Sequence, residues 1–92
     1  MTYNPEAHAK QVREVVDSLW LPEGISAEVY LGEEPFRWPH IKLHQQIDGL
    51  VYNNGYAFSE YEAEAVLIKG SVMRAVLGLQ RFIFDTRNGV RA

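Results

Sequence analysis

The residues best suited to chemistry in this sequence are basic and aromatic side chains that cluster in residues 36–47. The block contains Arg37, Trp38 and Lys42 with two histidines, and it contains no acidic residue. Such interleaving is typical of surfaces that bind single-stranded nucleic acid, because the charges follow the phosphates and the rings stack on the bases. The alternative is that Trp38 packs in a core while the charged residues form an ordinary solvated face. The residue types alone leave both interpretations open.

Charge is segregated along the whole chain, although the formal net charge is only −3. Residues 23–34 and residues 48–64 each carry four acids and no lysine or arginine. Residues 65–92 carry five basic residues against a single acid. Within them, Arg74 and Arg81 are seven positions apart, so a helix would place both on one stripe. This alternation favours a protein with two surfaces that contact a mixed protein and nucleic-acid assembly.

The acidic residues divide into a group with a structural explanation and a group without one. Glu60, Glu62 and Glu64 fall in what we expect to be the first turn of a helix, where the helix dipole favours negative charge. Glu33 and Glu34 occupy the expected tip of a hairpin. These two residues are therefore free to meet a basic partner.

No pattern of residues predicts catalysis or metal binding. His40 and His44 have the spacing of two zinc ligands on a helix, but the alternation around them predicts a strand. Their rings would then lie about 13 Å apart, which is too far to share one ion. The chain has no cysteine, no glycine-rich phosphate loop and no Gly-x-Ser-x-Gly motif. We therefore expect no enzyme activity, no metal, no cofactor and no small-molecule substrate.

The first part of the chain predicts a helix followed by a strand. Asn4 and Pro5 are typical of a helix start, where a side-chain oxygen caps the helix and a missing N–H costs nothing. Apolar residues then recur at helical spacing: Val12, Val15, Val16, Leu19 and Trp20. From Ile25 to Leu31 apolar residues alternate with polar ones, which predicts a half-buried strand.

The middle of the chain predicts two further strands. Residues 36–47 alternate in the same way, and we expect Pro39 at an edge or a bulge because it lacks an N–H group. Asp48-Gly49 is a strong signal for a two-residue hairpin turn, after which residues 50–53 would pair back. We expect Asn53-Asn54-Gly55 to form the next turn.

The last part of the chain predicts a long second helix. Ser59, with Glu62 three residues later, has the spacing of a capping box, and Asn88-Gly89 is a typical stop. Such a helix would be about 40 Å long, whereas a globule of this size is about 30 Å across. The helix must therefore project from the body or break, at Gly70 or Gly78. The complete prediction is one α+β domain, residues 1–92, with a small antiparallel three-stranded sheet and an N-terminal and a long C-terminal helix on one face (α-β-β-β-α).

Over its whole length the chain resembles phage-encoded anti-CRISPR proteins that inhibit the type I-F CRISPR-Cas surveillance complex. The segments that carry the resemblance are Tyr3-Asn4-Pro5-Glu6-Ala7-His8-Ala9-Lys10 and Gly49-Leu50-Val51-Tyr52-Asn53-Asn54-Gly55. The resemblance implies a stoichiometric inhibitor in the host bacterial cytoplasm, which binds the Cas protein–guide RNA assembly and blocks target DNA hybridisation. We expect no membrane partner, because no apolar run approaches the roughly 18 residues that span a bilayer.

The charge pattern then indicates how such an inhibitor would bind. Nine basic residues and a net charge of −3 do not fit a dense acidic mimic of DNA. We expect a wedge instead, in which Glu33 and Glu34 contact basic Cas surfaces. The residues expected on guide RNA or on acidic Cas surfaces are Arg37, Trp38, Lys42, Arg74 and Arg81.

The alternative function is a small phage or bacterial regulatory module that dimerises through an apolar helix face. A version that inserts its second helix into a DNA groove is disfavoured, because Glu60, Glu62 and Glu64 at the start of that helix would repel phosphate. A plain protein-interaction module remains open.

Overall fold

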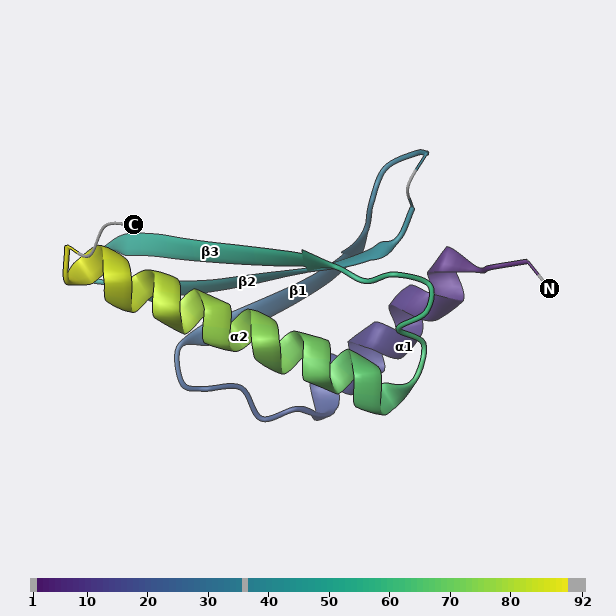
Figure 1. Cartoon of the computed structure of the whole chain (residues 1–92), viewed down its shortest axis with the longest axis horizontal. Helices are drawn as coiled ribbons and strands as arrows, with labels where there is room; N and C mark the ends of the chain where they lie inside the picture. The colour runs from purple at the N-terminus through teal and green to yellow at the C-terminus, as the bar shows by residue number, and fades with distance from the viewer. Residues whose placement is uncertain (1, 36, 90–92) are drawn as a thin grey trace.

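The computed structural model describes residues 2–35 and 37–89, and it has the predicted order of elements. These are α1 (Pro5–Ser18), β1 (Ile25–Leu31), β2 (Pro39–Ile47), β3 (Leu50–Ala57) and α2 (Ala65–Arg87). The strands form one antiparallel sheet in the order β1-β2-β3, and both helices pack against the same face of it (Figure 1). The predicted α+β architecture, α-β-β-β-α, is therefore confirmed.

The core lies between this covered face and the two helices. The burial of β1 alternates as predicted, with Ile25 buried and Glu28 exposed to solvent. The fully buried large apolar residues come from both layers: Val12, Ile41, Leu43, Phe58, Ile68, Val72 and Leu79. Because each strand sends alternate side chains to opposite faces, the other face of the sheet is left to polar residues.

The hairpin at Asp48-Gly49 is confirmed. Ile47 pairs directly with Leu50, so the loop has two residues, and the φ angles of Asp48 and Gly49 are 52° and 80°. Two successive positive φ angles define the turn type whose twist matches that of the flanking strands. Arg87, the last residue of α2, donates a hydrogen bond to Asp48 Oδ2 at 2.7 Å and so ties the helix end to this turn.

Two strand predictions are wrong in their boundaries. The second strand starts at Pro39 rather than at residue 36, and Phe36 lies outside the described residues. Pro39 is buried at the first position of the central strand, where its missing N–H is tolerated, rather than at an edge or a bulge. The turn expected at Asn53-Asn54-Gly55 is instead part of β3, because β2 is long enough to pair with it: Gly55 lies opposite Lys42.

The second helix begins later than predicted and does not break. It is one helix from Ala65 to Arg87, through Gly70 and Gly78, and would be about 34 Å long. The molecule is accordingly elongated, at 49 × 28 × 22 Å, and α2 runs along the whole sheet in Figure 1. The expected stop is confirmed, since Asn88 is the C-cap and Gly89 has a φ of 68°.

Residues 59–62 form a turn that precedes α2, and the contacts of Glu62 explain why. Its Oε1 accepts the N–H of Ser59 at 2.9 Å, which is half of the predicted capping box. The same carboxylate also accepts hydrogen bonds from the hydroxyls of Tyr56 and Ser71. These bonds to β3 and α2 hold Glu62 in the turn and outside the helix. The glutamates predicted for the first helical turn therefore lie before the helix, with Glu64 as its N-cap.

The first helix is attached to this same turn. Asn4 caps α1 as predicted, by accepting a hydrogen bond from the N–H of Ala7 at 3.1 Å. The buried His8 donates from Nε2 to the carbonyl of Glu62 at 2.7 Å, and its Nδ1 shares a hydrogen bond with the Tyr3 hydroxyl. The apolar stripe of α1 is confirmed except at Trp20, which lies beyond the end of the helix and is 85% exposed.

Candidate macromolecule interface

The uncovered face of the sheet brings one of the predicted site residues, Lys42, together with residues of the two other strands. Directly paired residues share a face, so the register fixes its layout. One row runs Tyr30, His40 and Ala57, the next Glu28, Lys42 and Gly55, and the third Ser26, His44 and Asn53. We call these nine residues the open sheet face. They form a polar and aromatic platform that neither helix covers.

The aromatic part of the platform is a stacked pair of rings. Tyr30 on β1 and His40 on β2 lie with ring centroids 5.2 Å apart and planes inclined by 21°. The ring of His40 is fixed by a hydrogen bond from Nδ1 to the carbonyl of Trp38 at 2.8 Å. Tyr30 is 42% exposed, so one side of its ring rests on the histidine and the remainder is accessible. A flat, fixed ring of this kind suits a base or another aromatic group.

Lys42 lies in the middle of the open sheet face. It pairs across the strands with Glu28 on one side and with Gly55 on the other. Both charged residues are exposed, and among the described residues Lys42 makes no ion pair. The face therefore presents one positive and one negative charge side by side, and its formal charge is close to zero.

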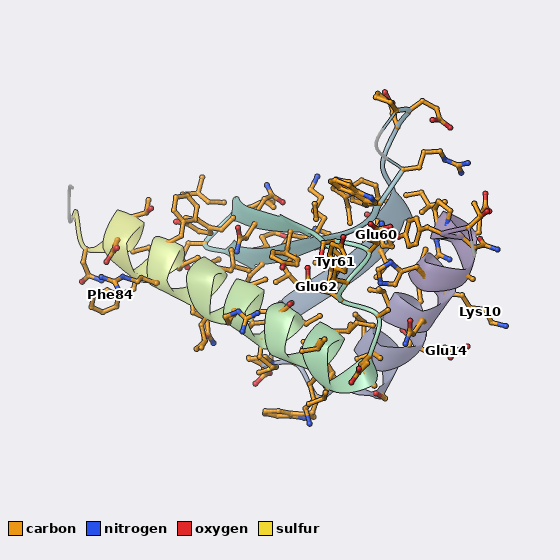
Figure 2. The ribbon with its side chains drawn as sticks, turned by 45° about the vertical axis from the view of Figure 1, so that its right-hand side comes forward. Lys10, Glu14, Glu60, Tyr61, Glu62 and Phe84 are labelled. Atoms are coloured by element: carbon orange, nitrogen blue, oxygen red, sulfur yellow. The ribbon has the colours of Figure 1, made fainter. Side chains whose placement is uncertain are left out.

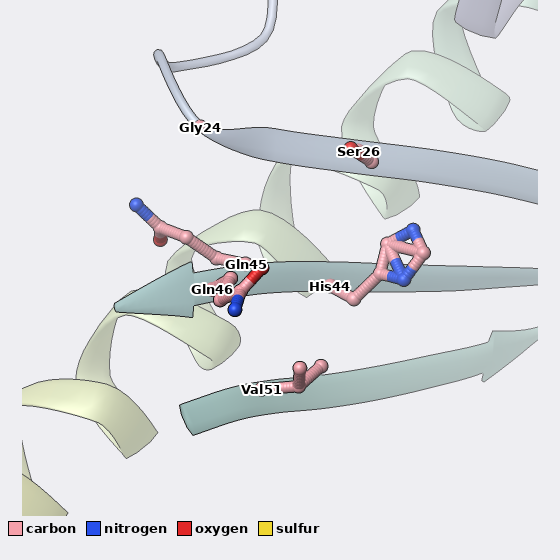
Figure 3. Close-up of a pocket in the computed structure, with 6 residues that line it drawn as sticks. All are labelled: Gly24, Ser26, His44, Gln45, Gln46 and Val51. Atoms are coloured by element: carbon pink, nitrogen blue, oxygen red, sulfur yellow. The ribbon is translucent and has the colours of Figure 1, made fainter. Parts of the chain in front are cut away.

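Two open depressions mark this side of the sheet. One, of about 390 Å³, is lined by Tyr30, Lys42, Asn53, Asn54 and Gly55, and the missing side chain of Gly55 helps to form it. The second, of about 340 Å³, lies at the end of β2. Figure 3 shows residues of all three strands around it: Ser26, His44, Gln45, Gln46 and Val51, with Gly24 before β1. The two depressions are lined mainly by amides, hydroxyls and rings that can donate and accept hydrogen bonds.

The loop between β1 and β2 carries the next four predicted residues. It projects from one end of the sheet (Figure 1). Glu33 and Glu34 are exposed there. Arg37 already has partners within the chain, because its guanidinium contacts Glu6 of α1 at 3.2 Å and Glu34 at 3.9 Å. Trp38 lies before the strand rather than on it, and it is 38% exposed.

Arg74 and Arg81 are on α2 and therefore belong to a different surface. Arg74 donates to Ser71 Oγ at 3.2 Å, and Arg81 lies 3.9 Å from Asp85. Because α2 covers the opposite face of the sheet, no single flat contact can include both arginines and Lys42. The structure thus brings Lys42 together with the open sheet face, groups Glu33, Glu34, Arg37 and Trp38 in one loop, and separates the two arginines from both.

Sequence reasoning missed Tyr30 and Asn53 as candidate site residues. Asn53 could have been predicted, because a two-residue turn at 48–49 fixes the β2–β3 register and places Asn53 beside His44. The pairing of Tyr30 with His40 could not be predicted in this way, since the loop between β1 and β2 is too long to fix the register of the two strands.

Comparisons with known proteins leave the site to be interpreted from its own chemistry. The chain matches no known protein family, and no curated protein or solved structure is significantly similar to it. Within residues 2–35 and 37–89, no three histidine, aspartate or glutamate side chains lie close enough to hold a metal ion. Over the same residues, neither helix is long and apolar enough to cross a bilayer.

Proposed function

We propose that this chain is a stoichiometric inhibitor that acts in the host bacterial cytoplasm by binding the type I-F Cas protein–guide RNA complex and blocking target DNA hybridisation. The identity of the partner rests on the sequence resemblance in residues 3–10 and 49–55. The observation that carries the binding mode is the open sheet face, a rigid platform with stacked rings and a central lysine. Such a platform binds without turnover, which is what a stoichiometric inhibitor requires.

The charges of the platform support a mixed contact. Surveillance complexes hold nucleic acid with lysines and arginines and leave part of the guide strand exposed. Tyr30 and Lys42 offer a ring and a cation to an exposed guide nucleotide, or to an acidic Cas surface. Glu33 and Glu34 in the projecting loop, together with Glu28, offer carboxylates to neighbouring basic Cas residues. The combination agrees with a wedge and not with a uniform mimic of DNA.

Because Arg37 forms ion pairs within the chain, Lys42 is the better position for a charge-reversal test. A charge reversal at Arg37 would break its contacts with Glu6 and Glu34, so a loss of binding could come from a displaced loop. Lys42 has no such partner within residues 2–35 and 37–89. Its matched control is Lys10, an exposed lysine on the outer side of α1 (Figure 2).

The test is a gel shift of labelled target DNA by the purified type I-F complex in the presence of this protein. Wild type is expected to abolish the shifted band, and Lys42→Glu is expected to need about tenfold more protein, because reversing one partner of an interface charge pair costs about 1.4 kcal/mol or more. Lys10→Glu should behave as wild type. Equal effects of the two reversals would remove the open sheet face from the mechanism, and an unaffected complex would refute the proposal.

The alternative, a module that dimerises through an apolar helix face, keeps one observation in its favour. Large apolar side chains on α2 remain exposed, among them Val66 at 70%, Leu77 at 61% and Phe84 at 63%. Sedimentation of the isolated protein separates the two functions, since the inhibitor proposal requires no dimer. What this helix face would hold is argued next.

A further inference from the structure

The outer side of α2 carries a second apolar stripe, distinct from the one that packs in the core. The core-facing residues are Ile68, Ser71, Val72, Ala75, Val76, Leu79 and Ile83. On the opposite side, positions separated alternately by four and three residues are Val66, Gly70, Met73, Leu77, Gln80 and Phe84. We call these six residues the outer seam. Figure 2 shows Phe84 standing out from the end of the helix.

The spacing of the outer seam is that of a helix–helix contact. Alternating steps of four and three keep a stripe on one side of a helix over several turns, as in a coiled coil. From position 66 to position 84 the stripe extends about 27 Å at 1.5 Å per residue. Val66, Leu77 and Phe84 are exposed along it, Gly70 and Met73 are half-buried, and Gln80 is polar. Large exposed apolar side chains gathered on one side of a helix indicate an interaction site. The occupant it fits is therefore another amphipathic helix.

The charges beside the outer seam indicate which charge the partner helix should carry. Arg74 and Arg81 follow the seam on one side, and Lys69 lies on the other. The single acid of α2 is Asp85, which lies one turn after Arg81 and 3.9 Å from it, on the same side of the seam as the two arginines. In a parallel or antiparallel pair of two α2 helices, the flanking positions of one copy would face arginine, lysine or apolar residues of the other. A second copy is thus disfavoured by like charge.

We propose that the outer seam of α2 binds an acidic amphipathic helix of a partner protein, with carboxylates of that helix facing Arg74, Arg81 and Lys69. The interaction uses a surface opposite the open sheet face and does not depend on the proposed inhibition. Arg74 donates to Ser71 and Arg81 lies 3.9 Å from Asp85, so carboxylates of the partner helix would compete with these contacts for the two arginines.

The experiment uses the full chain and two labelled peptides of about three heptads, with leucine at the seam positions. One peptide has glutamate at all flanking positions and the other has lysine, so neither pairs with itself. Fluorescence anisotropy should show that the glutamate peptide binds about tenfold more tightly than the lysine peptide, with a preference that falls as salt is added. Equal binding of both peptides, or of neither, overturns the proposal.

Variants of the chain distinguish a loss of peptide binding at the outer seam from a loss of folding. Leu77→Glu, at a position that is 61% exposed, should abolish peptide binding while the circular dichroism spectrum and melting temperature stay near wild type. The triple reversal of Lys69, Arg74 and Arg81 to glutamate should exchange the preference and bind the lysine peptide. Lys42→Glu should bind as wild type does.

Two further outcomes would assign the seam to a different occupant and refute the proposal. One is a dimer in analytical ultracentrifugation that Leu77→Glu dissociates. The other is binding to phosphatidylglycerol vesicles that Leu77→Glu abolishes, without binding of the glutamate peptide. Both measurements use the same preparation as the peptide titration.

Discussion

Replacing Glu62 by glutamine should destabilise the fold, because this carboxylate is the acceptor at the junction of β3, the 59–64 turn and α2. Tyr56 donates to both oxygens at 2.9 and 2.8 Å, the N–H of Ser59 donates to Oε1 at 2.9 Å, and the hydroxyl of Ser71 donates to Oε2. Ser71 is only 1% exposed, so water cannot replace a lost partner there. An amide in place of the carboxylate presents N–H groups to one of these donors.

The magnitude follows from the bonds that are weakened. Hydrogen bonds to a charged group contribute about 1.5–3 kcal/mol each when desolvated, and Glu62 is only half-buried. Glutamine keeps one acceptor oxygen, so we expect a loss of about 2 kcal/mol in the free energy of unfolding at pH 7. For a chain of this size that loss corresponds to a melting temperature lower by about 10 °C.

The pH dependence gives an independent check on the same group. Burial acts to raise the pKa of Glu62, but the hydrogen bonds from Ser71, Ser59 and Tyr56 outweigh it and hold the pKa below its ordinary value of 4.5. A depressed carboxyl pKa stabilises the fold above the ordinary value, and that contribution is lost as the pH falls through the folded value. The difference between wild type and Glu62→Gln should therefore be largest at neutral pH and shrink in acid.

Urea unfolding of wild type, Glu62→Gln and Glu60→Gln at several pH values measures this directly. Glu60 is an exposed neighbour in the same turn (Figure 2), and its replacement should change stability by less than about 0.5 kcal/mol. If the two variants are equally stable at pH 7, or if the gap for Glu62→Gln does not vary with pH, the carboxylate does not hold the junction together.

Two further stability predictions use matched pairs of variants in urea unfolding. Leu79→Ala should lower the free energy of unfolding by about 3 kcal/mol, because Leu79 is fully buried. Leu77→Ala, at an exposed position, should lower it by less than about 0.5 kcal/mol. The reverse order would mean that the other face of α2 is buried. Gly49→Ala should cost about 1 kcal/mol because its φ is 80°, whereas Gly70→Ala should stabilise the continuous helix by about 0.5–1 kcal/mol. A destabilising Gly70→Ala would contradict an unbroken α2.

The candidate interface could be predicted from the sequence only in part. The basic and aromatic block at residues 36–47 indicated Lys42, and strand alternation placed His40 and His44 on the same face. Which neighbours complete the face depends on the β1–β2 pairing, which brings Tyr30 against His40 and Glu28 against Lys42. The contact of Arg37 with Glu6 could not be predicted for the same reason, because Glu6 is distant in sequence and becomes a neighbour only after α1 packs beside the loop.

The sequence by itself determined the features that depend on a few adjacent residues. Asn4 caps α1, Asp48-Gly49 makes the hairpin turn and Asn88-Gly89 ends α2, because each requires only a local side chain or a permitted positive φ.

Tertiary structure decided the features for which the local signals were ambiguous. Asn53-Asn54-Gly55 could turn, but pairing with β2 and a hydrogen bond from Asn54 to the carbonyl of Ala75 keep it extended. Ser59 could have started a helix, but Glu62 bonds to Tyr56 and Ser71 instead. In the sequence of α2, apolar residues recur at helical spacing on two sides of the helix. Packing against β2, β3 and α1 selects the side that is buried, because burying one side of the helix leaves the opposite side outward.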